Sequence, residues 1–191
     1  DRSLVGSEMC IRDSFCISYK DYETYKRDGA NVDKLLVCPN GAQHRDYHFT
    51  EKPLKPSWTL YLGRIEPRKR QYLYQDIYGV EFVGKYTDTT SFDRNRDCYL
   101  GQWEHEYKLQ HVTDYGNMML LSDGENGTPL VIKEALVAGL GVVVSKYAAH
   151  DLDTSLPFVT VIPDDKWEDI EYVQKKLIEN RKISVTMRKE I

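Results

Sequence analysis

Short apolar runs alternate with stretches of helical character along most of the chain, and this alternation restricts the fold more than any other feature. A short apolar run bounded by turn residues is typical of a strand buried on both faces. Strands that alternate with helices predict β–α–β units and a parallel sheet with helices on both faces, an α/β fold. The expected strands are 35–38, 58–62, 80–83, 98–100, 117–121, 140–144 and 158–162, and the expected helices are 67–76, 103–113, 129–138 and 166–179.

A polar segment with two candidate phosphate ligands directly follows the expected strand 58–62. In open parallel sheets, ligands bind beyond the carboxyl ends of the strands. After Gly63, Arg64 offers a forked contact to phosphate oxygens and Lys69 adds a compact positive charge. The run 68–70 taken alone is more typical of a solvated basic face, so the prediction depends mainly on the position of Gly63 and Arg64 at a strand end.

A second polar segment, 123–135, predicts an anion site at the start of a helix. Thr128 is a preferred N-cap, and Pro129 is tolerated at the first helical position because its N–H would lack a partner anyway. Gly127 lets the backbone approach a ligand, and the free amides of the first turn attract negative charge. Glu134 projects about one turn deeper. The segment suits the diphosphate and ribose of a nucleotide sugar; the alternative is an ordinary capped helix with an exposed Glu.

Composition excludes several classes of protein. The net charge of −4 and the pI near 5.8 give no general attraction to nucleic acid or anionic membranes. No apolar run approaches the roughly 20 residues that span a bilayer. Apart from Cys10, the cysteines at 16, 38 and 98 are far apart, which argues against a zinc site or a disulfide framework and fits a reducing, cytoplasmic compartment.

The two ends of the chain carry their own expectations. Residues 1–14 resemble a translated transposon end used in sequencing-library preparation, and are left out of the fold prediction as a scar. The alternative is a genuine short N-terminal segment. On the scar interpretation the natural chain extends upstream. The end at 188–191 falls inside an expected helix, so a cut is expected there as well.

A set of short motifs resembles the donor-binding C-terminal half of retaining glycosyltransferases with the GT-B fold, of the family-4-like (group 1) kind. The motifs are 63–69, 82–84, 99–101 and 125–139, in family order, with a Pro-Asn-Gly turn at 39–41 that resembles the family's domain entrance. The resemblance covers roughly residues 30–180. It implies a Rossmann-like domain over 35–191, truncated at both ends and preceded by an N-terminal remnant, 15–34. The helix after Pro67 is short for the family, so we expect a sheet trimmed at one side.

The resemblance also implies roles for particular residues. Arg64 and Lys69 match the positions that hold the diphosphate, and Glu134 matches the glutamate that bonds the ribose hydroxyls. The family spacing places Asn126 rather than Glu125 at the first-glutamate position, so either residue could fill that role near the sugar. The backbone that faces sugar and phosphates corresponds to Gly127, Thr128, Pro129, Leu130 and Val131.

The activity implied is transfer of a sugar from a nucleotide-diphosphate donor with retention, with no cofactor and no metal. The acceptor would be a glycan, a lipid-linked glycan or a small molecule, and nucleic acid is not expected as a partner. A missing N-terminal half would supply the acceptor cleft and any peripheral contact with the inner face of a membrane, so the fragment alone is expected to be inactive. Two alternatives stay open: a noncatalytic nucleotide- or sugar-binding module, prompted by Asn126, and a GT-B-fold sugar-nucleotide epimerase.

Overall fold

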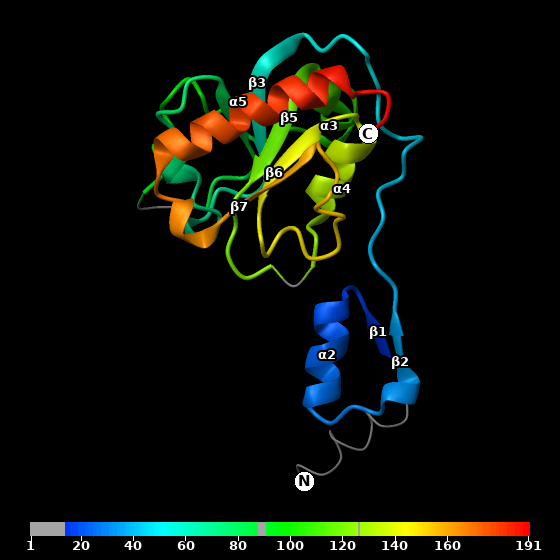
Figure 1. The fold of residues 1–191 in the computed structure, drawn as a ribbon. Helices are drawn as coiled ribbons and strands as arrows, with labels where there is room; N and C mark the ends of the chain where they lie inside the picture. Colours follow the sequence, from blue (N-terminus) through cyan, green and yellow to red (C-terminus); the bar gives the residue numbers. More distant parts are fainter. Residues whose placement is uncertain (1–13, 88–90, 126) are drawn as a thin grey trace.

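The computed structural model describes residues 14–87, 91–125 and 127–191, and its strands form two separate sheets (Figure 1). The smaller sheet pairs β1 (Ser14–Cys16) in parallel with β2 (Leu35–Val37), and α2 (Tyr19–Arg27) and the 3₁₀ turn η1 (Val32–Lys34) connect them. We call residues 14–37 the small unit. Its strand β2 lies outside the main sheet, whereas residues 35–37 were expected to belong to the larger domain.

The larger sheet is parallel throughout, with the strand order β4-β3-β5-β6-β7. Every residue of β4, β5 and β6 is buried, which is typical of strands covered on both faces. The predicted fold class is therefore confirmed. The strands are β3 (Lys55–Leu62), β4 (Val80–Val83), β5 (Tyr115–Leu120), β6 (Gly141–Ser145) and β7 (Val159–Ile162).

In the part of the chain that the structure describes, three α-helices lie around this sheet (Figure 1). The longest, α5 (Ile170–Thr186), packs against β3, β5, β6 and β7, and α4 (Leu130–Val137) packs against β5 and β6. The third, α3 (His105–His111), continues as the 3₁₀ turn η4 (Val112–Asp114) into β5. Among the described residues, no helix is both long and apolar enough to cross a membrane.

The β4 edge of the sheet is reduced, as expected from the short segment after Pro67. The expected helix 67–76 is replaced by two 3₁₀ turns, η2 (Pro67–Lys69) and η3 (Gln71–Tyr74). Between them Arg70 has a left-handed φ of 53°, which an α-helix does not accommodate. The expected strand 98–100 forms only an isolated bridge, in which Phe82 donates to the carbonyl of Cys98 at 2.7 Å and accepts from Leu100 at 2.9 Å.

The C-terminal helix differs from its prediction at both ends. A 3₁₀ turn, η5 (Asp164–Lys166), occupies the place where the helix was expected to begin. Asp169 caps α5 by accepting a hydrogen bond from the amide of Tyr172 at 3.0 Å, and the helix then continues to Thr186. The capping side chain therefore fixes the start, which the charge pattern alone did not locate.

A linker, 38–54, joins the small unit to the sheet and is fixed to the larger body at its end (Figure 1). The amide of His48 donates to the carbonyl of Leu109 at 2.9 Å. The buried guanidinium of Arg188 donates to the carbonyls of Thr50 at 2.6 Å and Tyr115 at 3.0 Å. Burial lowers the pKa of Arg188 to about 10, because the charged form loses its hydration.

Candidate functional site

The order of the strands locates a crevice between the loops that follow β3 and β5. From β3 the chain moves to β4 on one side, and from β5 it moves to β6 on the other side. The two connections therefore diverge, and the loops beyond the carboxyl ends of β3 and β5 face each other at the topological switch point. These are loop 63–70 and loop 121–129. The two polar segments singled out in the sequence are thus brought together.

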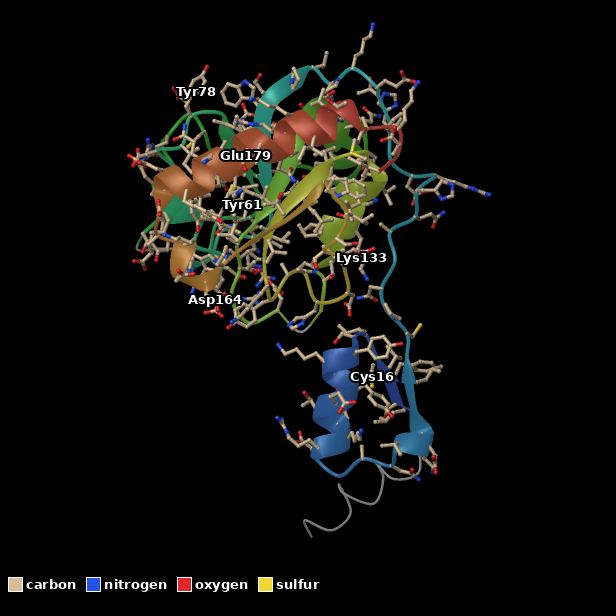
Figure 2. The ribbon with its side chains drawn as sticks, viewed as in Figure 1. Cys16, Tyr61, Tyr78, Lys133, Asp164 and Glu179 are labelled. Carbon is tan, nitrogen blue, oxygen red and sulfur yellow. The ribbon has the colours of Figure 1, made fainter. Side chains whose placement is uncertain are left out.

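The side chain of Tyr61 ties the two loops to each other. This residue of β3 is fully buried (Figure 2), and its hydroxyl donates to the carbonyl of Lys69. The same oxygen accepts from the amide of Leu121 at 3.1 Å. Burial is the main reason why the pKa of Tyr61 is raised well above its usual value, so the hydroxyl keeps its proton. Tyr61 was not singled out in the sequence, because a buried strand residue carries no signal of its hydrogen bonds.

Further contacts fasten loop 63–70 to Asp123. The amide of Asp123 donates to the carbonyl of Arg68 at 3.1 Å, and Nη1 of Arg68 donates to the carbonyl of Asp123 at 3.2 Å. The carboxylate of Asp123 accepts from Nη2 of Arg70 at 3.1 Å. The guanidinium of Arg70 also lies 4.0 Å from the centre of the Trp167 ring. The Arg68-Lys69-Arg70 run is therefore in part a site component, not only a solvated face.

Three cations of loop 63–70 lie beside two carboxylates. Lys69 Nζ is 3.5 Å and Arg68 Nη1 is 3.3 Å from Glu125 Oε1. Glu66 lies 3.1 Å from Arg68 and 3.7 Å from Arg64. Partial burial lowers the pKa of Arg68, but the carboxylates of Glu125 and Glu66 outweigh it and raise that pKa overall. We call Arg64, Arg68 and Lys69 the cation cluster.

Within this cluster the two predicted phosphate ligands differ in accessibility. The Arg64 side chain is 63 % exposed, whereas that of Lys69 is 11 % exposed. The stem of Lys69 lies on Gly63, where a Cβ would be 3.5 Å from its Cδ. Gly84 permits the neighbouring strand end to approach, since a Cβ there would lie 1.9 Å from the carbonyl oxygen of Gly63. Any larger residue at position 84 would push the loop away.

The start of α4 differs from the prediction that Thr128 is its N-cap. The helix begins at Leu130 with Pro129 in the cap position, and no side chain caps it. Instead Thr128 pairs with Asp151: its amide donates to Oδ2 of Asp151 at 3.1 Å, and its hydroxyl accepts from the amide of Asp151 at 3.0 Å. One amide of the predicted cradle is thus already bonded to a carboxylate. The amides of Leu130 and Val131 belong to the first turn, whose N–H groups lack partners inside a helix.

The small unit lies against this helix start. A Cβ at Gly127 would be 2.9 Å from Cβ of Ser18, so the two backbones approach closely. Lys20 Nζ donates to the carbonyl of Glu125 at 2.9 Å, and Lys133 Nζ donates to the carbonyl of Asn40, in the linker, at 2.5 Å. Between them is a pocket of about 260 Å³, lined by Ile17 and Asn40 on one side and by Arg68, 124–125 and 127–130 on the other.

Glu134 is buried rather than facing this pocket. It is 7 % exposed, and its Oε1 accepts from Lys108 Nζ of α3 at 2.8 Å. Its Oε2 is buried beside the hydroxyl of Tyr47, which is buried as well. Burial, and then the nearby Glu134, raise the pKa of Tyr47. Among the contacts of the described residues, none joins Glu134 to the cation cluster. Because Glu134 is buried and paired with Lys108, Glu134→Ala would disturb the packing as well as any contact with a ligand.

The remaining site residue named from the sequence, Asn126, lies outside the described residues. The structure therefore brings together Arg64, Lys69, Glu125 and the backbone before α4, and it adds Arg68, Lys20 and Tyr61. Lys108 and Asp151 were not expected as partners of Glu134 and Thr128, because they are distant in sequence.

The similarity of this chain to known proteins lies in its structure and not in its sequence. No protein-family model and no curated protein sequence matches the chain. HepE from Anabaena, solved in complex with UDP, is 13 % identical, with a TM-score of 0.71 over 91 % of this chain and 56 % of HepE. Sucrose-phosphate synthase from Thermosynechococcus elongatus is 15 % identical, with a TM-score of 0.65 over 98 % of this chain and 57 % of that one.

A third similar structure is TarM from S. aureus, whose complex contains UDP; it is 15 % identical, with a TM-score of 0.67 over 92 % of this chain and 38 % of TarM. The described fold matches the Rossmann-like α/β half of GT-B glycosyltransferases. The chain spans little more than half the length of HepE.

Proposed function

We propose that the chain is the donor-binding half of a glycosyltransferase, which binds a nucleoside-diphosphate sugar and transfers the sugar with retention. The observation that carries the proposal is the cation cluster at the topological switch point, next to the start of α4. A diphosphate needs positive groups and N–H donors at one place, and this crevice combines the cations with the first turn of α4.

The similar structures support the choice of ligand. HepE was solved with UDP, with UDP-glucose, and with UDP and glucose, and the TarM complex also contains UDP. At these low identities the likeness concerns the fold, so the ligand of this chain is part of the proposal. The acceptor is also part of the proposal: a glycan, a lipid-linked glycan or a small molecule. So is any contact with a membrane, which residues outside this chain would make.

In the proposed complex, Arg64 and Lys69 hold the diphosphate together with the amides of Leu130 and Val131. Departure of the glycosyl group leaves negative charge on the diphosphate, and fixed cations stabilise that charge without a metal ion. Glu125 and Asn126 lie near the sugar. Glu134 accepts hydrogen bonds from the ribose hydroxyls. Its carboxylate is buried beside Lys108, so it must become accessible to the ligand.

The test is a calorimetric titration of nucleoside diphosphate into the 191-residue chain, with a chelator present. Arg64→Ala and Lys69→Ala should each lose a charge-assisted contact, which costs about 1.5–3 kcal/mol or roughly 10- to 150-fold in affinity. The matched control is Arg27→Ala, since Arg27 is 75 % exposed on α2 and lies outside the cation cluster.

If the wild type and both variants bind nucleoside diphosphate with equal affinity, Arg64 and Lys69 do not hold the diphosphate. Binding that needs a divalent ion would contradict the metal-independent part of the proposal. Since the chain alone is expected to be inactive, retention is read separately, by NMR, from the anomeric configuration of the product formed by a full-length protein that contains this chain. A full-length protein that binds nucleotide sugar but is a noncatalytic module or an epimerase would yield no transfer product.

A further inference from the structure

We propose that Glu125 is a resident anion of the cation cluster: its carboxylate occupies the position of a donor phosphate, and the donor binds by exchange with it. This inference rests on the proposed function and goes beyond it. It assigns to Glu125 a part in selecting the charge of the ligand, in addition to any contact with the sugar.

One carboxylate oxygen of Glu125 lies between two cations, as an oxygen of a bound phosphate would. A single atom, Oε1, lies 3.3 Å from Arg68 Nη1 and 3.5 Å from Lys69 Nζ, so one oxygen bridges two cations. The side chain is only 15 % exposed. An exposed glutamate gains little from one such ion pair, but a mostly buried carboxylate between two cations is held more firmly.

The backbone of Glu125 is fixed independently of its carboxylate. Lys20 of the small unit donates to the Glu125 carbonyl at 2.9 Å. Gly124 just before it has a left-handed φ of 70°, and Asp123 is bonded through its amide to Arg68. The Glu125 side chain can therefore rotate away from the cations while the loop keeps its place. Exchange of anions then requires rotation of one side chain and no rearrangement of the loop.

The net charge of the cation cluster determines which ligands can replace the Glu125 carboxylate. The three cations of the cluster face two carboxylates, Glu125 and Glu66, which leaves a formal charge of +1, from 3 − 2. Release of Glu125 raises this to +2. A ligand must therefore supply enough negative charge to replace the carboxylate, as a diphosphate does. A weakly charged anion gains little from the exchange, so Glu125 disfavours such ligands.

Glu125→Gln tests this by removing the competing charge while it keeps the size of the side chain. We expect nucleoside diphosphate to bind about three- to tenfold more tightly than to the wild type, because two ion pairs no longer compete. Inorganic phosphate, which carries less negative charge than nucleoside diphosphate, should gain affinity by a larger factor, because Glu125 disfavours it more in the wild type. Glu179→Gln is the matched control, since Glu179 pairs with Lys176 on α5 outside the cluster.

Glu125→Asp is the second variant, because it keeps the charge and should not tighten binding as Gln does. Urea unfolding of each variant confirms that it is folded. Unchanged or weaker binding of nucleoside diphosphate to Glu125→Gln would overturn the inference, while wild-type binding that depends on Arg64 and Lys69 would leave the proposed function in place. Failure of both the wild type and Glu125→Gln to bind would overturn the two together.

Discussion

Removal of one oxygen atom, in Tyr61→Phe, should loosen the whole candidate site. The Tyr61 hydroxyl is the shared partner of the Lys69 carbonyl and the Leu121 amide, which belong to the two loops of the crevice. The ring itself stacks on Phe82 with centroids 5.6 Å apart, and phenylalanine preserves that packing. The substitution therefore isolates the hydrogen bonds from the apolar contacts.

The expected loss of stability follows from the two partners left behind. Each buried hydrogen bond contributes about 0.5–1.5 kcal/mol net, and a buried group that loses its partner costs about 1–3 kcal/mol. Loss of the buried hydroxyl offsets part of this, because its own desolvation disappears. We therefore expect the free energy of unfolding to fall by about 2–3 kcal/mol. Nucleoside-diphosphate affinity should fall too, because Lys69 loses the anchor of its backbone.

Urea unfolding at pH 7, followed by circular dichroism, measures the first effect, and calorimetry measures the second. Tyr78→Phe removes the same atom from a side chain that is 81 % exposed, so it is the control for the chemical change alone. A Tyr61→Phe variant as stable as the Tyr78→Phe variant would show that the two loops hold together without this hydroxyl. The account of the site as a scaffold built on Tyr61 would then be wrong.

Two further outcomes follow from buried polar groups. Burial raises the pKa of Tyr61, Tyr74 and Tyr115, so above pH 10 the unfolded chain loses these protons before the folded chain does. The contribution of these tyrosines to the free energy of unfolding is therefore fully present below pH 10. Above pH 10 it falls by about 1.4 kcal/mol per pH unit for each tyrosine. Equal urea midpoints at pH 9 and pH 11 would contradict this. Lys108→Met should cost about 1.5–3 kcal/mol, since it leaves the Glu134 carboxylate unpaired. Addition of Glu134→Gln to that variant should restore part of the loss in the same unfolding assay.

The parallel sheet could be predicted because buried strands are a local property of the sequence. The run 140–144 is almost entirely apolar, and it covers β6 except for Ser145; every residue of β6 is buried. The same reasoning located β3 and β5, and therefore the two loops at the switch point. The β4 edge was harder: 98–100 has a strand composition, but its pairing with Phe82 is limited to one bridge, and pairing partners are not encoded in the run itself.

Side-chain partners could not be predicted, because they depend on residues that only the fold brings near. Thr128 before Pro129 has the local pattern of a helix cap, yet Asp151, which is distant along the chain, forms two hydrogen bonds with it. Since each of these bonds satisfies a backbone amide, the pair competes successfully with capping, which would satisfy one. The local pattern was correct about the helix and wrong about its cap.

The same reasoning explains why both predicted glutamates are bonded to cations in the structure. Glu125 and Glu134 were singled out as ligand groups because carboxylates at these spacings suit a nucleotide sugar. A carboxylate that is mostly buried is stable only if cations or donors compensate for its lost hydration. Lys69 and Arg68 do so for Glu125, and Lys108 does so for Glu134. Each proposed contact with the donor is therefore an exchange of partners, and the affinity that a titration measures is the difference between two bonded states.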